Sequence, residues 1–283
     1  MGRLGIIAGA GDLPHIAMRE AIRQGEDPIF FSILESDFHP GDFKERCMPV
    51  YITQIGKIFK LCKKNNVDRI LLLGKVKKEI ILKTYRFDLK TITILAKMLN
   101  QNDYTFFEVA AKEFDKEKIQ IISQKTYLKP LLLPEGRYTK SKLSKSKLED
   151  IEYGMNMAHN LATLDIGQTV VVTQKMILAV EAIEGTDETI KRGGELSRKK
   201  GAVVCKSTKA NQDERFDLPT IGIDTLQNMH SSGCDTIAIR ANETIVVNPK
   251  EFIQEANKLK INFISYSGPE SHKYNAEKKI QTY

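Results

Sequence analysis

A short polar stretch in the second half of the chain carries residue types that phosphate chemistry uses. It comprises Glu184, Gly185, Thr186, Asp187 and, little more than a helical turn later, Arg192. If a helix begins here, its N-terminus, a hydroxyl, a carboxylate and a nearby cation suit a phosphate or a metal–phosphate group. The alternative is that Thr186 or Asp187 only caps the helix.

A second polar segment runs from Lys206 to Asp217. Its charged and amide side chains are Lys206, Lys209, Gln212, Asp213, Glu214, Arg215 and Asp217. In an extended conformation Asp213, Arg215 and Asp217 would point to one side. Two carboxylates and a guanidinium on one side suit Mg²⁺ and a diphosphate, because Mg²⁺ prefers oxygen ligands and arginine pairs with phosphate oxygens. One carboxylate could instead act as a general base for water. Composition alone favours a solvated loop.

A glycine-rich turn lies near the start of the chain. The apolar run Leu4–Ala8 is followed by Gly9, Ala10, Gly11, Asp12, Leu13 and Pro14. Such a turn presents backbone N–H groups and a helix N-terminus to an anion, although a simple tight turn would have the same sequence. Pro14 stands where the dinucleotide fingerprint has its third glycine, which argues against NAD. Asp12 would repel a phosphate, so we expect it to contact a sugar or base hydroxyl.

The elements expected around this turn indicate an α/β fold. Buried strands at Leu4–Ala8, Pro28–Leu34 and Arg69–Leu73 alternate with helices, which predicts a Rossmann-like parallel sheet. Lys75 stands just beyond the third strand, where open α/β sheets place their ligands. A nucleotide contact and a solvated lysine are both consistent with this position.

The second half predicts a further α/β domain. Thr169–Thr173 and Met176–Ala182 are apolar, rich in β-branched residues and close in sequence, so we expect adjacent strands. We predict an N-terminal domain at residues 1–134, a C-terminal domain at 148–283 and an exposed basic linker at 135–147.

The amino-acid composition limits the classes to which this protein can belong. The 283 residues are 41% hydrophobic and 28% charged, with a net charge of +7, which fits a globular protein with an anionic partner. The four cysteines form no C-x-x-C pair and no run of about 18 apolar residues occurs, so we expect a cytoplasmic protein for which any membrane contact would be peripheral. P-loop, H-E-x-x-H and G-x-S-x-G motifs are absent from the sequence.

Four stretches resemble the LpxI family, the UDP-2,3-diacylglucosamine pyrophosphatases of lipid A biosynthesis. They are Gly5–Pro14, Leu164–Val172, Ala179–Asp187 and the pattern Lys206…Lys209…Gln212-Asp-x-Arg-x-Asp-x-Pro-Thr-x-Gly222. The resemblance extends from residue 4 to about 265. One departure is Lys209-Ala210-Asn211, where the family usually has Lys-Pro.

The resemblance implies an enzyme that uses Mg²⁺ to split UDP-2,3-diacylglucosamine into UMP and 2,3-diacylglucosamine 1-phosphate (lipid X), with water attacking the β-phosphorus. It also implies two α/β domains that enclose the substrate. The family's essential acid corresponds to Asp217, and we expect catalysis to involve Asp217, Asp213 and Arg215. The expected metal ligands are Asp217, Asp213 and Glu184. The expected substrate contacts are Gly9, Ala10, Gly11, Asp12, Leu13, Lys75, Gln168, Gly185, Thr186, Asp187, Arg192, Lys206, Lys209 and Gln212.

The rival hypothesis is a non-catalytic module that binds a nucleotide or nucleic acid. The net charge, the lysine-rich segment at 140–147 and the glycine-rich turn fit it. Aromatic residues are only 7% of the chain and tryptophan is absent, which disfavours a reader of nucleic acid that stacks on bases. The preferred partner is therefore a UDP-linked diacylated glucosamine lipid, with no nucleic acid.

Overall fold

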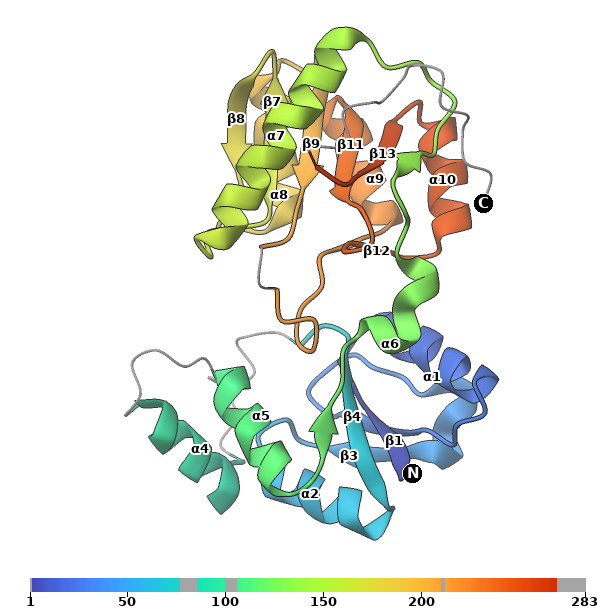
Figure 1. The fold of residues 1–283 in the computed structure, drawn as a ribbon, viewed down its shortest axis with the longest axis vertical. Coiled ribbons are helices and arrows are strands. Elements are labelled where there is room, and N and C mark those ends of the chain that lie inside the picture. Colours follow the sequence, from blue (N-terminus) through green and yellow to red (C-terminus); the bar gives the residue numbers. More distant parts are fainter. Residues whose placement is uncertain (1, 77–85, 100–105, 210–211, 269–283) are drawn as a thin grey trace. The chain divides into compact units, whose positions relative to one another are not determined.

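The computed structural model describes residues 2–76, 86–99, 106–209 and 212–268. The chain forms two compact units (Figure 1). The first unit comprises Met1–Lys129 and Glu214–Phe216, and the second comprises Pro130–Asp213 and Asp217–Tyr283. Both contain helices and strands, so the predicted α/β class is confirmed.

The first unit contains a parallel sheet with the strand order β3-β2-β1-β4-β5. Its strands are β1 (Arg3–Ala8), β2 (Ile29–Ile33), β3 (Cys47–Val50), β4 (Val67–Leu73) and β5 (Gln120–Ile121). Its helices are α1 (Leu13–Arg23), the 3-10 helix η1 (Gly41–Arg46), α2 (Ile55–Lys64), α4 (Leu89–Leu99), α5 (Phe106–Lys116) and α6 (Lys125–Leu128).

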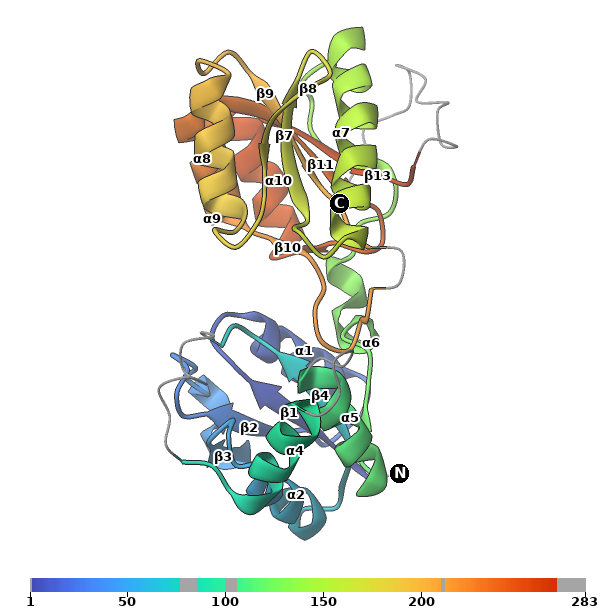
Figure 2. The same cartoon turned by 90° about the vertical axis from the view of Figure 1, so that its left-hand side faces the viewer.

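Helices cover both faces of this sheet. Figures 1 and 2 show α1 and α6 on one face and α2, α4 and α5 on the other. The core beneath the second group joins Ile7 and Phe31 of the sheet to Ile58 of α2 and Phe114 of α5. Because parallel strands are buried on both faces, they read as continuous apolar runs, which explains why these strands were recognisable in the sequence.

The second unit contains a mixed sheet with the order β6-β13-β11-β9-β7-β8. Its strands are β6 (Gly136–Arg137), β7 (Thr169–Thr173), β8 (Met176–Val180), β9 (Ala202–Lys206), β11 (Cys234–Arg240) and β13 (Asn262–Tyr266), while β10 (Thr220–Ile221) and β12 (Ile245–Val246) form a separate pair. Its helices are α7 (Lys145–Thr163), α8 (Thr186–Leu196), α9 (Ile223–Ser232) and α10 (Pro249–Lys258), and the 3-10 helix η2 (Lys129–Leu131) begins at the last residue before the boundary.

Successive residues of the central strands are buried against helices on opposite faces of the sheet. Val171 and Val204 belong to the core shared with α8, α9 and α10, whereas Val170 and Val203 belong to the core shared with α7. Figure 2 shows α7 on one face of the sheet and α8, α9 and α10 on the other. This alternation follows from the two-residue period of a strand. The expected pairing of the segments at 169–173 and 176–182 is confirmed as an antiparallel pair.

Residues 136–139, expected to be part of an exposed linker, instead belong to the second unit. Gly136 and Arg137 pair with β13, and Tyr138 is only 1% exposed. The Thr139 hydroxyl accepts a hydrogen bond from the Phe263 N–H at 2.9 Å. The linker interpretation counted polar residues and missed the β6 pairing; the lysine-rich part begins only at Lys140.

In the described part of the chain, no helix combines the length and the apolar character needed to cross a bilayer.

Candidate active site

The ends of three strands meet at one edge of the sheet in the second unit. β7 runs antiparallel to β9, so Thr169 at the start of β7 lies opposite Lys206 at the end of β9. Glu181 directly follows β8, and α8 begins at Thr186. The strand arrangement therefore brings these four side chains together, although three separate stretches of sequence carry them.

Lys206 is the buried cation of this group. Its side chain is 6% exposed, and its Nζ donates to the Thr186 hydroxyl at 2.7 Å and to the Thr169 hydroxyl at 3.2 Å. Glu181 Oε2 forms an ion pair with the same Nζ at 3.7 Å. Burial lowers the pKa of Lys206, while the charges of Glu181, Asp217 and Asp187 act in the opposite direction.

The N-terminus of α8 lies beside this lysine. Gly185 is the N-cap residue, with a φ of 86° that favours glycine, and no side chain caps the helix. The alternative that Thr186 or Asp187 only caps the helix is therefore wrong. The Thr186 hydroxyl instead donates to Glu181 Oε1 at 3.1 Å while it accepts from Lys206. The first-turn N–H groups and the ammonium together make a region that favours an anion.

Glu184 and Arg192, expected to bind metal and phosphate, bind each other. Arg192 Nη2 donates to Glu184 Oε1 at 2.6 Å and to the Val180 carbonyl at 2.7 Å. The pKa of Glu184 lies below its usual value because its own backbone N–H and the Arg192 guanidinium donate to the carboxylate. In this arrangement both groups stabilise the turn that leads into α8.

Asp217 is held by two glutamines. Gln168 Nε2 donates to Asp217 Oδ2 at 3.4 Å, and Gln212 Nε2 donates to the Asp217 carbonyl at 2.7 Å. The Gln168 carbonyl accepts from the Ser207 N–H at 2.9 Å, directly after Lys206. Asp217 is exposed, and its charge reaches the Lys206 ammonium. The structure thus brings three of the predicted residues, Gln168, Gln212 and Asp217, to the edge where Lys206 lies.

The segment from Asp213 to Asp217 is a turn and not the extended stretch that we expected. The Asp217 N–H donates to the Asp213 carbonyl at 3.4 Å, which closes the turn. Arg215 belongs to the first unit, where its guanidinium lies over the Phe216 ring, 5.1 Å from the ring centroid. Asp213, Arg215 and Asp217 therefore do not share one side of a strand. A period of two applies only where the backbone is extended.

The structure also places Lys209 and Asp187, two further predicted residues. Lys209 forms an ion pair with Asp165 at 2.7 Å. Residues 210–211, where the chain departs from the family pattern, lie outside the described residues. Asp187 is exposed in the first turn of α8.

The arrangement does not assemble the metal ligands expected from the sequence. Within the described residues, no three His, Cys, Asp or Glu side chains are grouped so that they could hold a metal ion. Glu184 is occupied by Arg192, as described above. Mg²⁺ therefore does not fit the set Asp217, Asp213 and Glu184 as these residues are placed, and we derive no catalytic step through it.

The glycine-rich turn of the first unit lies at the carboxyl ends of β1 and β4. Ala10 and Lys75 exchange backbone hydrogen bonds at 3.0 and 2.8 Å. A Cβ on Gly74, whose φ is 91°, would lie 2.3 Å from the Gly9 carbonyl oxygen, so only glycine allows this approach. Asp12 and Leu13 then lead into α1, with Asp12 exposed at the N-cap position. The strand order reverses between β1 and β4, which is where open α/β sheets bind ligands.

Glu181 and Thr169 are the site residues that the sequence reasoning missed. Glu181 falls within the predicted strand Met176–Ala182, and Thr169 begins another predicted strand. The signal that could have found them is antiparallel pairing, which brings the start of one strand beside the ends of its neighbours. Without that pairing, a lone glutamate after an apolar run has no recognisable partner.

Comparison with known proteins covers both units. The family model of the LpxI N-terminal domain matches residues 3–131, and that of the LpxI C-terminal domain matches residues 134–264. The chain is 29% identical over 269 residues to the UDP-2,3-diacylglucosamine pyrophosphatase LpxI of Caulobacter vibrioides, across 92% of this chain and 95% of that protein. The chain therefore belongs to the LpxI family.

Proposed function

We propose that this protein hydrolyses the pyrophosphate of UDP-2,3-diacylglucosamine to UMP and 2,3-diacylglucosamine 1-phosphate in lipid A biosynthesis. The observation that carries the proposal is the placement of Asp217, held by Gln168, at the strand edge where buried Lys206 and the N-terminus of α8 lie. A carboxylate within reach of water and a buried cation beside a helix N-terminus are the groups that phosphate ester and anhydride hydrolysis needs. The relative from Caulobacter vibrioides carries this activity in its name.

Asp217 takes the proton of the attacking water in the proposed reaction. The water oxygen forms a bond to the β-phosphorus, and the bond from that phosphorus to the bridging oxygen breaks. The bridging oxygen and its electron pair leave with UMP. Lys206 and the N–H groups of α8 stabilise the negative charge on the phosphoryl oxygens.

The nucleotide end of the substrate is assigned to the first unit. We propose that Gly9, Ala10, Gly11 and Leu13 contact it through the turn after β1, with Asp12 on a sugar or base hydroxyl and Lys75 on ribose or phosphate. The Rossmann-like character expected for this sheet is supported by the strand order and by the glycines that let the two loops meet.

Mg²⁺ dependence remains a proposal from the family resemblance. If the ion is required, its ligands must include groups beyond the predicted set as placed here, such as oxygens of the substrate itself. The rival function, a nucleic-acid binding module, is not favoured by membership of the LpxI family.

Incubation of the purified protein with UDP-2,3-diacylglucosamine and Mg²⁺ tests the function directly. We expect release of UMP and lipid X, and failure to detect UMP in the presence of a range of divalent cations would refute the proposal. Running the reaction in ¹⁸O water tests the site of attack. Label in lipid X supports attack at the β-phosphorus, whereas label in UMP places the attack at the α-phosphorus.

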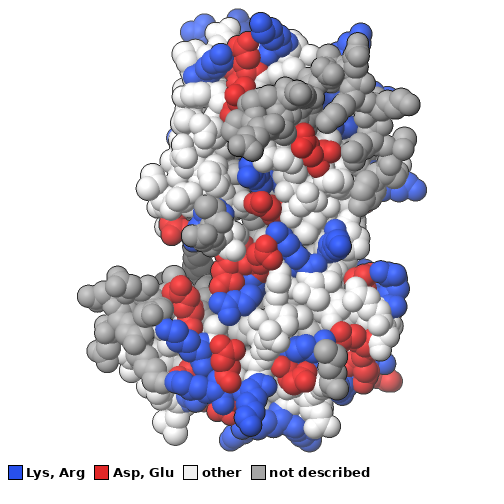
Figure 3. Space-filling view, viewed as in Figure 1, with Lys and Arg blue, Asp and Glu red and all other residues white. Residues whose placement is uncertain are grey.

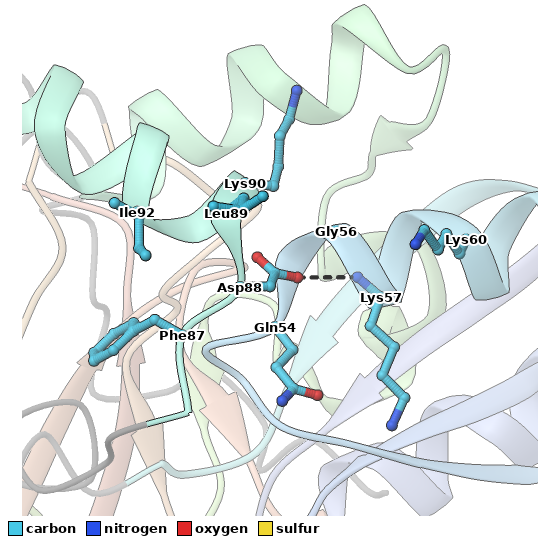
Figure 4. Close-up of a pocket in the computed structure, with 9 residues that line it drawn as sticks. All are labelled: Gln54, Gly56, Lys57, Lys60, Phe87, Asp88, Leu89, Lys90 and Ile92. Carbon is cyan, nitrogen blue, oxygen red and sulfur yellow. Dashed lines mark hydrogen bonds between the residues drawn. The ribbon is translucent and has the colours of Figure 1, made fainter.

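We also propose that the first unit contacts an anionic membrane surface at the groove between α2 and α4. Lys57, Lys60, Leu89 and Ile92 line this groove, whose volume is about 690 Å³ (Figure 4). Leu89 is 84% exposed and Ile92 50%, and they stand on one face of α4. Exposed apolar side chains flanked by lysines suit the surface of a bilayer that contains anionic lipids.

The charge of α2 supports the same proposal. Figure 3 shows lysine and arginine side chains, with some acidic ones among them, gathered where Figure 1 labels α2. Among the described residues, Lys57 and Lys60 form no side-chain ion pair, whereas Lys63 is paired with Glu117. Asp88 is occupied by the backbone N–H groups of Lys57 and Thr91.

A further inference from the structure

We propose that Glu181 is a positioning residue of the pyrophosphatase reaction, which holds the Lys206 ammonium in place at the N-terminus of α8 and keeps it charged. The inference rests on the proposed function and adds to it a residue to which the sequence assigned no role. Three observations carry it: the burial of the lysine, the hydroxyl that connects the two groups, and the fixed backbone of Glu181.

The burial of Lys206 requires a compensating charge. The residue is 5% exposed, and an ammonium removed from water is costly unless an opposite charge lies near it. The carboxylates whose charges act on Lys206 are those of Glu181, Asp217 and Asp187. Of these, only Glu181 forms an ion pair with Lys206 in the structure, and its own side chain is 13% exposed. Asp217 and Asp187 are exposed to water, which screens their charges.

The Thr186 hydroxyl connects the two charged groups. It accepts from Lys206 at 2.7 Å and donates to Glu181 Oε1 at 3.1 Å, whereas Oε2 lies 3.7 Å from Nζ and forms no hydrogen bond in the described part of the chain. The distance of 3.7 Å exceeds that of a charge-assisted hydrogen bond. Glu181 therefore acts on Lys206 through its charge and through Thr186.

The backbone fixes Glu181 where this interaction needs it. Its N–H donates to the Thr169 carbonyl at 2.8 Å. A Cβ on Gly167 would lie 2.0 Å from the Glu181 carbonyl oxygen, so the absence of a side chain at position 167 lets the two strands approach. The Thr169 hydroxyl in turn accepts from Lys206 at 3.2 Å. The same short stretch thus anchors the carboxylate and receives the ammonium.

Removal of the Glu181 charge should change how the activity depends on pH. Burial already lowers the pKa of Lys206, and the carboxylate opposes this. In Glu181→Gln the pKa of Lys206 falls further, so the amine loses its proton at a lower pH. Because the reaction needs the charged form, the alkaline limb of the pH profile moves to lower pH.

The test compares kcat/KM of the wild type with Glu181→Gln, Glu181→Asp and the control Glu195→Gln, an exposed position of α8, between pH 6 and 9.5. We expect Glu181→Gln to move the alkaline limb down by about one pH unit, so the loss is small below the new midpoint and rises to about tenfold above the wild-type midpoint. Glu181→Asp restores part of the shift, because it keeps the charge. The control removes an exposed carboxylate of the same helix, so its limb stays in place. An equal loss for Glu181→Gln at every pH, or no loss at any pH, overturns the inference.

A second measurement does not depend on catalysis. In protein labelled with ¹⁵N-lysine, the Lys206 Nζ resonance is assigned as the one absent from Lys206→Met, and its titration is followed by NMR. The inference predicts a lower midpoint in Glu181→Gln than in the wild type, and an unchanged midpoint overturns it. If the wild type releases no UMP, the proposed function fails and this titration still decides the Glu181–Lys206 relationship.

Discussion

Gln168 donates a hydrogen bond to Asp217 although 49 positions of sequence separate them. The bond engages Oδ2, and Oδ1 forms no hydrogen bond among the described residues. One oxygen of the carboxylate is therefore oriented by the amide, and the other remains available to a water molecule. This geometry suits a general base whose rotamer is fixed before the substrate binds.

Asp217→Asn tests the role of this carboxylate. An amide of the same shape cannot accept the proton of water, so we expect kcat to fall by at least ~10²-fold with KM within about threefold. Steady-state release of UMP measures both constants. Asp224→Asn, an exposed position in the first turn of α9, is the control and should behave as the wild type. Turnover near the wild-type rate in Asp217→Asn would show that Asp217 is not the base.

Gln168→Leu tests whether the amide orients Asp217. Loss of one hydrogen bond to a charged group is worth about 1.5–3 kcal/mol, so kcat should fall by roughly 10- to 100-fold, less than in Asp217→Asn. Gln227→Leu on the exposed side of α9 is the matched control. If the double variant with Asp217→Asn loses the product of the two single effects, the residues act independently and the orienting role is refuted.

The buried pair of Glu181 and Lys206 should cost stability. We expect the double variant Glu181→Gln/Lys206→Met to be inactive and at least as stable as the wild type. Its free energy of unfolding, measured in urea, should equal that of the wild type or exceed it by up to about 1–4 kcal/mol. Lys206→Met alone should be less stable than the double variant, because it leaves Glu181 without its cation.

The direction in which stability changes with pH follows from the lowered pKa of Lys206. Between its folded value and the ordinary 10.5, the unfolded chain binds more protons, so stability should rise with pH in the wild type relative to the double variant. A double variant less stable than either single variant would contradict this account.

Binding to liposomes tests the groove between α2 and α4. The wild type should sediment with vesicles that contain phosphatidylglycerol and much less with pure phosphatidylcholine, and 0.5 M salt should weaken the binding. Lys57→Glu/Lys60→Glu and Ile92→Asp should each reduce it. Lys200→Glu/Lys250→Glu makes the same change of charge on the second unit and should bind as the wild type. Equal loss in both double variants would indicate a nonspecific effect of net charge.

Titration with Mg²⁺ after treatment with EDTA tests the ligand set expected from the sequence. Since Glu184 pairs with Arg192, we expect Glu184→Gln to keep the Mg²⁺ concentration for half-maximal activity within about threefold of the wild type. A shift of tenfold or more would show that Glu184 changes its partner when the metal and the substrate are bound.

The elements that were predictable are those with continuous apolar patterns. The strands at Leu4–Ala8 and Arg69–Leu73 and the turn at Gly9 were visible, because a parallel sheet buries both faces and its loops need glycine. The edge strand β6 was missed, since a strand of two residues leaves no period in the sequence. The turn at Asp213–Asp217 was mistaken for an extended segment, because five residues of mixed charge do not specify a backbone conformation.

The residues of the candidate site were found only where each carries a recognisable type or family pattern. Asp217, Gln168 and Lys206 were identified in this way. The partners of these residues were not, because Glu184 gives no sign in the sequence that Arg192 will bind it. Glu181 was missed altogether, since its importance comes from antiparallel strand pairing, which is a long-range property.

The path of the chain through the two units limits how the gene for this protein can be divided. Glu214–Phe216 belong to the first unit although they are carried inside the sequence of the second. Glu214 accepts from Ser123 and pairs with Lys125 at 2.6 Å, and Phe216 packs against the first unit's core. A gene fragment that ended near residue 129 would encode the first unit without three of its residues. The first unit is therefore not encoded by one continuous stretch of sequence, and recombination at the boundary near residue 130 should be selected against unless both parts of the gene are inherited together.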